Sequence, residues 1–169
     1  MSVFFALWPS AAAAQALAET AALLAPALEG KPVPPDKIHL TVAFLGNLPE
    51  SGLAQAIDAG DSVLADGFAL ALDHVGAFRG ARVAWAGASA PPAALIELHR
   101  QVRAAAAGRG LPVEDRAFAP HMTLVRGIRR PLPRTSLPEA IGWDVEGFAL
   151  LRSAPGTGVY STVAAWDLR

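Results

Sequence analysis

The sequence contains no cysteine among its 169 residues. Disulfide bonds, thiolate nucleophiles and cysteine-ligated zinc sites are therefore excluded. Charge is also sparse, because charged residues make up 17% of the chain and the net charge is −1. This balance gives no overall attraction toward nucleic acid or an anionic membrane. A local exception is the segment 116–134, which has five arginines and no acid and forms either a basic patch or a solvated loop.

Long hydrophobic runs are missing as well. No uninterrupted apolar stretch is long enough to span a bilayer. The N-terminus lacks the basic lead-in of a signal peptide, and its apolar run from Val3 to Trp8 predicts a first strand. We therefore expect a cytoplasmic protein without a membrane partner. The length suits one bilobal domain over residues 1–169.

Prolines, glycines and apolar periodicity divide the chain into alternating strands and helices. Helices are predicted to begin after Ser10, at Pro49 and after Pro92. Strands are predicted at 3–8, 38–45, 68–72, 82–86, 118–127, 145–152 and 159–168. Because several strands are joined by short links, we expect antiparallel or mixed sheets in an α+β fold.

One pattern occurs twice, about half a chain apart. His39-Leu-Thr41 and His121-Met-Thr123 each follow a helix and a proline-containing loop, and each strand is closed by a glycine. Side chains alternate between the two faces of a strand, so each histidine shares a face with its threonine. Two lobes of similar build, each supplying one such strand, would explain the repetition.

Two imidazoles and two hydroxyls that converge on one volume suit a phosphate undergoing in-line displacement. One histidine can accept a proton from the attacking oxygen while the other donates a proton to the departing oxygen. The threonine hydroxyls can hydrogen-bond the non-bridging oxygens, where charge develops. This chemistry needs no metal and no cofactor. A single His-x-Thr strand is usually structural, but two copies in matching context are difficult to dismiss.

The segments Ile38-His-Leu-Thr-Val-Ala-Phe-Leu-Gly46 and Pro120-His-Met-Thr-Leu-Val-Arg126 resemble the two signature motifs of the two-histidine (2H) phosphoesterase superfamily. More narrowly, the chain is similar to the RNA 2′,3′-cyclic phosphodiesterases, also called 2′-5′ RNA ligases. The same pattern continues in Val3-Phe-Phe-Ala, Arg82-Val-Ala-Trp85, Arg116-Ala-Phe118 and Gly158-Val-Tyr160. The resemblance implies two pseudo-symmetric lobes of mainly antiparallel sheet, with helices outside and a central cleft.

The resemblance also implies roles for single residues. His39 would be the proton donor to the leaving 3′-oxygen, and His121 the proton acceptor that activates water. Thr41 and Thr123 would hold the phosphate oxygens. The product would be a 2′-phosphomonoester, and the reverse reaction would be 2′-5′ ligation.

Three further residues are candidates for substrate contacts. The position five after each histidine lies near the site in relatives, so Phe44 would stack on a base or ribose and Arg126 would bind phosphate. Strict alternation puts both on the face opposite their histidines. They reach the site only if each strand bends or ends before them, which the following Gly46 and Gly127 would permit. Arg130, with Arg129, is the candidate for an RNA-backbone contact.

Alternatives remain open. The substrate could be a small cyclic nucleotide, such as ADP-ribose 1″,2″-cyclic phosphate, or a 2′-5′ linked oligonucleotide. The cleft could also bind RNA without turnover. His74 is expected at a turn or surface and His99 at a helix margin, both without catalytic roles. We expect a monomer whose partners are RNA ends or small nucleotides carrying a cyclic phosphate.

Overall fold

The computed structural model describes residues 1–169 and contains one nine-stranded sheet and three α-helices. The strands are β1 (Ser2–Leu7), β2 (Lys31–Pro32), β3 (Leu40–Asn47), β4 (Phe68–Phe78), β5 (Val83–Gly87), β6 (Met122–Arg126), β7 (Thr135–Val145), β8 (Gly147–Ser153) and β9 (Tyr160–Asp167). The helices are α1 (Ala11–Leu28), α2 (Glu50–Asp61) and α3 (Ala93–Ala107), with a 3-10 turn, η1 (Pro35–Lys37), before β3. The prediction of an α+β fold with antiparallel strands is confirmed.

The sheet is built from two equivalent halves. Its order is β7-β4-β5-β6-β3-β1-β8-β9, and every pairing is antiparallel. The halves meet where β3 and β6 pair through Leu40 and Met122. Each half has four strands counted outward from this junction, which gives the predicted pseudo-symmetric lobes. β2 lies beside β6 where β3 has diverged from it.

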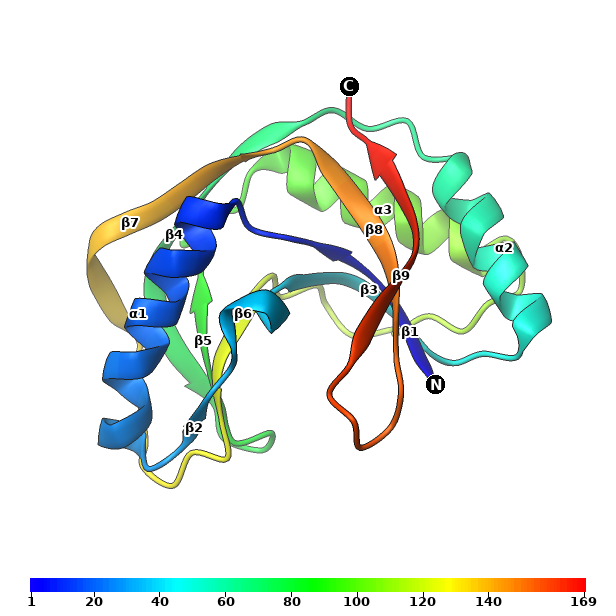
Figure 1. Ribbon diagram of the computed structural model, residues 1–169. Coiled ribbons are helices and arrows are strands. Elements are labelled where there is room, and N and C mark those ends of the chain that lie inside the picture. The colour runs from blue at the N-terminus through cyan, green and yellow to red at the C-terminus, as the bar shows by residue number, and fades with distance from the viewer.

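The helices pack on opposite halves of the sheet. α1 contacts β2, β6 and β7, whereas α2 contacts β8 and β9 and α3 contacts β3. Figure 1 shows α1 at the left and α2 at the right of the molecule. α1 follows β1 in one half of the sheet and covers the half that contains β6 and β7. α3 follows β5 in that second half and covers β3 in the first. These crossings tie the two halves together around the central strands.

Helix α1 is the one helix that could span a membrane, although Gln15, Glu19 and Thr20 interrupt its apolar run. By length and composition alone it is long and apolar enough to do so, with a mean hydropathy of 1.3. Its buried positions form one stripe that includes Leu17, Ala21 and Leu28 and packs into the main core. A helix that covers a sheet passes the same test of length and composition, so the hydropathy of α1 carries little weight.

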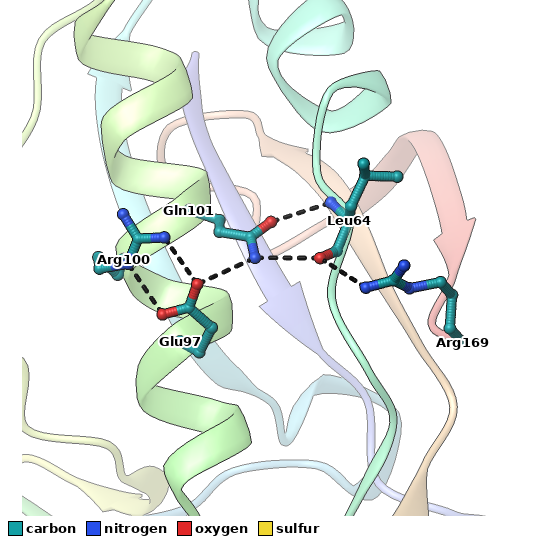
Figure 2. Close-up of polar contacts among 5 residues, drawn as sticks. All are labelled: Leu64, Glu97, Arg100, Gln101 and Arg169. Atoms are coloured by element: carbon teal, nitrogen blue, oxygen red, sulfur yellow. Dashed lines mark hydrogen bonds and ion pairs between the residues drawn. The ribbon is translucent and has the colours of Figure 1, made fainter.

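A polar network fastens α3 to the segment that follows α2 (Figure 2). The amide of Gln101 accepts a hydrogen bond from the backbone N–H of Leu64 at 2.9 Å and donates one to its carbonyl at 3.0 Å. Arg169 donates to the same carbonyl at 3.2 Å. Glu97 accepts from Gln101 at 3.1 Å. The network ties α3, the helix that carries His99, to this segment.

The strand β7 was absent from the predicted elements. It contains Pro138 and Gly142 and most of its residues are exposed, so its apolar alternation is weak. The reason is its position at the edge of the sheet, where proline is tolerated and one flank needs no partner.

Candidate active site

The two His-x-Thr segments meet at the junction between the halves of the sheet. His39 directly precedes Leu40 and His121 directly precedes Met122, the two residues that pair across β3 and β6. Continuing this antiparallel register by one residue places His39 opposite Thr123 and Thr41 opposite His121. Leu40 and Met122 are fully buried, so the histidines and threonines occupy the other face of the sheet.

Each imidazole is anchored by the backbone two residues before it. The Nδ1 of His39 lies 2.8 Å from the carbonyl oxygen of Lys37, and the Nδ1 of His121 lies 2.7 Å from that of Ala119. A carbonyl oxygen can only accept, so Nδ1 carries the proton in both rings. The Nε2 of each histidine is then the nitrogen left for proton transfer.

Both histidines line one small cavity of about 80 Å³. Its other lining residues are Val33, Lys37, Thr41, Thr123 and Arg126. Two cations, two hydroxyls and two imidazoles therefore surround a space sized for a few heavy atoms. This composition favours an anion with several oxygen acceptors, such as a phosphate group. No three side chains of histidine, aspartate or glutamate gather closely enough to hold a metal ion.

Burial changes the acidity of both histidines. Desolvation lowers the pKa of His39, and the positive charges of Arg126 and of protonated His121 lower it further. Desolvation also lowers the pKa of His121, with a further contribution from Arg116. Both rings therefore lose a proton more readily than an exposed histidine in the absence of a bound anion.

A β-bulge in each strand explains how Phe44 reaches the cleft. On β3, Thr41 pairs with Ala6 and Ala43 with Phe5, so Val42 is left over. The extra residue reverses the alternation, and Phe44 returns to the face of Thr41. The bulge bends β3 before Phe44, which is the condition that the sequence set for this side chain to reach the site.

The bulge on β6 does the same for Arg126. Thr123 pairs with Trp85 and Val125 with Ala84, which leaves out Leu124. Both bulges fall on the third residue after the motif histidine. The pseudo-symmetry of the fold thus extends to the irregularities of the two strands.

A larger cavity of about 710 Å³ adjoins the small one. The two share Thr41, His121, Thr123 and Arg126, but His39 lines only the small cavity. Aromatic side chains form part of the wall of the large cavity: Phe44, Phe78 and Phe118. Such a wall suits a planar ring that stacks, such as a nucleobase.

Aromatic neighbours hold the two catalytic candidates differently. His39 stacks on Phe4 at 5.2 Å between ring centroids and meets the edges of Trp8 and Tyr160 at 5.8 and 5.2 Å. His121 has one such contact, with Phe78 at 4.9 Å. Sequence reasoning assigned no site role to Phe4, Phe78 or Lys37, because none lies in a repeated motif.

Arg130 and His74 both lie outside the two cavities. Arg130 lines neither cavity and pairs with Glu29 at 3.6 Å, near the end of α1. His74 lies inside β4 and is 6% exposed, so the prediction of a turn or surface position was wrong. Its Nδ1 is 2.9 Å from the carboxylate of Asp73, which satisfies the buried ring.

His99 joins the two motif segments from α3. Its Nδ1 donates to the carbonyl of Val42 at 2.7 Å, at the bulge of β3. Its ring also stacks on Phe118 at 4.0 Å with an interplanar angle of 5°, three residues before His121. One side chain thus braces β3 at its bulge and the loop that leads into β6.

Replacing His99 with leucine should lower the free energy of unfolding by about 1–3 kcal/mol, because the Val42 carbonyl loses its donor in a partly buried place. Urea denaturation measures the change. The matched control is Arg100→Leu at the next, exposed position of α3, where we expect a change within about 0.5 kcal/mol. Equal stability for the His99 variant and the parent would contradict the bracing role.

Comparisons with known proteins agree with this geometry. A family model described as the 2′-5′ RNA ligase superfamily matches residues 6–157. The chain is 37% identical over 144 residues to the RNA 2′,3′-cyclic phosphodiesterase of Escherichia coli K12, covering 82% of this chain and 80% of that protein. It is 33% identical to the RNA 2′,3′-cyclic phosphodiesterase of Thermus thermophilus, covering 100% and 91%. The structure of E. coli LigT complexed with 3′-AMP superposes with a TM-score of 0.87 at 32% identity, covering 99% and 97%.

Proposed function

The chain belongs to the 2′-5′ RNA ligase superfamily, and from that premise we propose that it hydrolyses RNA 2′,3′-cyclic phosphate ends to 2′-phosphomonoesters. The single observation that carries the proposal is the small cavity lined by both motif histidines. Relatives at 33–37% identity that cover most of the chain bear the name RNA 2′,3′-cyclic phosphodiesterase. Monomeric state, cytoplasmic location and organisation as one domain over residues 1–169 are part of the same proposal.

The proposed mechanism uses the two Nε2 atoms on opposite sides of the phosphorus. Neutral His121 removes a proton from water as the water oxygen attacks phosphorus. Protonated His39 donates its proton to the 3′-oxygen as the bond from phosphorus to that oxygen breaks. Since each Nδ1 is held by a backbone carbonyl, neither ring needs to reorient during the transfer. The histidines end with their protonation states exchanged, and solvent resets them.

Three groups are positioned to stabilise the charge on the non-bridging oxygens. The hydroxyls of Thr41 and Thr123 and the guanidinium of Arg126 line the same cavity as the imidazoles. Donors held in place before the reaction lower the barrier most when they face the charge that develops. Phe44, on the wall of the larger cavity, would stack on the base or ribose next to the cyclic phosphate.

The direct test is incubation of the protein with a short oligoribonucleotide that ends in a 2′,3′-cyclic phosphate. We expect conversion to the 2′-phosphate at a rate that EDTA does not change, because side chains alone transfer the protons. Chromatography separates the 2′-phosphate from the 3′-phosphate product. An intact substrate, a 3′-phosphate product, or activity that disappears with the chelator would overturn the proposal.

The pH profile of kcat/KM should be bell-shaped and centred on the acid side of about 6.5, the unperturbed value for histidine. Activity rises as the base loses its proton and falls as the acid loses its own. Burial lowers the pKa of both His39 and His121, so both limbs move to lower pH. A bound phosphate raises both values again, and the profile of kcat should lie at higher pH than that of kcat/KM. A kcat/KM profile centred at alkaline pH would contradict this assignment.

A further inference from the structure

The two ends of the large cavity differ in how their cations are paired. At one end Arg103 pairs with Asp115 at 3.1 Å and Arg116 with Glu114 at 2.9 Å. Each of these arginines already has a carboxylate partner within the protein. At the other end lies Arg126, which has no carboxylate within ion-pair distance and lines both cavities. Its cross-strand partner Lys31 is also in no ion pair.

We define the cationic rim as Lys31, Arg79 and Arg129, three exposed side chains on segments that adjoin the end of β6. Lys31 of β2 is the direct cross-strand partner of Arg126, so their side chains share a face. None of the three takes part in the ion pairs of the protein. None lines either cavity, so the rim lies just outside the space proposed for the reacting nucleotide.

The other two rim residues are brought to the same place by the β4–β5 turn and the segment after β6. Arg79 opens the turn whose next residues, Gly80 and Ala81, line the large cavity. Arg82 closes the turn and donates to the carbonyls of Ile128 at 3.1 Å and Gly127 at 3.3 Å, which fastens the turn to the chain just before Arg129. In Figure 1 the start of β2, this turn and this segment lie together at the lower left.

From this asymmetry we propose that the RNA strand 5′ of the cyclic phosphate leaves the cleft across the cationic rim. Its phosphodiester groups then meet unpaired cations, whereas the opposite exit presents arginines that are already paired and the carboxylate of Glu114. The inference rests on the proposed function and deepens it. It makes a polynucleotide a better substrate than a nucleoside 2′,3′-cyclic phosphate, because only the polynucleotide reaches the rim.

The test compares a triple variant, Lys31→Gln with Arg79→Gln and Arg129→Gln, with a control that loses three charges elsewhere. The control carries Arg100→Gln, Arg109→Gln and Arg152→Gln, none of which lines either cavity. The rim variant should lower kcat/KM on a short oligoribonucleotide 2′,3′-cyclic phosphate about tenfold and leave the mononucleotide rate unchanged. Each phosphate contact to a single strand contributes about 0.7 to the slope of log affinity against log salt concentration. The rim variant loses three such contacts, so its slope for the oligoribonucleotide should be smaller than that of the parent by about 2. The control should change neither rate.

A binding measurement separates failure of this inference from failure of the proposed function. Fluorescence anisotropy with a labelled oligoribonucleotide that ends in a 2′-phosphate reports on the rim even if no substrate is turned over. The rim variant should bind it about tenfold more weakly than the parent, and the control should bind like the parent. Equal binding by parent and rim variant, an equal loss in the control, or equally potent displacement by poly-glutamate would overturn the inference.

Discussion

Replacing His39 or His121 with alanine should lower kcat/KM for a 2′,3′-cyclic phosphate end by about 10²–10⁴-fold in each case. Both rings line one small cavity, and the hydrogen bond of each Nδ1 to a backbone carbonyl leaves Nε2 for proton transfer. The double variant should be little slower than either single variant, since an acid and a base that act in one step are not additive. Initial rates of 2′-phosphate formation measure all three.

The leaving group separates the roles of the two histidines. A phosphodiester whose aryl leaving group departs without a proton no longer needs the general acid. On that substrate His39→Ala should recover most of the lost rate, whereas His121→Ala should stay slow. The reverse pattern would exchange the proposed roles. His74→Gln, at a histidine outside both cavities, is the control, and an equally large loss there would show that the effect is not specific to the site.

The sequence predicted that the two His-x-Thr segments converge, because its signal is local and repeated. The His-x-Thr pattern places imidazole and hydroxyl on one face through the strand period alone. The half-chain repetition predicted two lobes, and the structure has two equivalent half-sheets that meet at Leu40 and Met122. The family assignment is confirmed by the model that matches residues 6–157.

The features that the sequence did not reveal depend on contacts between distant segments. A bulge is a mismatch between two strands, so Val42 and Leu124 look like ordinary apolar residues until their partners on β1 and β5 are known. The stack of His99 on Phe118 joins α3 to the loop before β6 in the same way. The pairing of Arg130 with Glu29 likewise depends on how α1 packs beside the segment after β6.

Replacing Thr41 or Thr123 with valine should lower kcat for the cyclic phosphate by about 10²-fold each, with a smaller change in KM. Valine keeps the shape and the β-branched preference for a strand but removes the hydroxyl. The antiparallel register sets each threonine opposite the histidine of the other strand, so the two losses should be of similar size. Steady-state kinetics on the oligoribonucleotide substrate measures both constants.

Serine at either position restores a hydroxyl and should recover most of kcat, which a loss caused only by altered strand packing would not allow. Thr162→Val in β9, whose side chain is exposed and lies outside both cavities, is the matched control and should leave kcat unchanged. If valine at Thr41 or Thr123 raised KM and left kcat intact, the hydroxyls would bind the ground state and the transition state equally. In that case the stabilisation of the developing charge would fall to Arg126 and the two imidazoles.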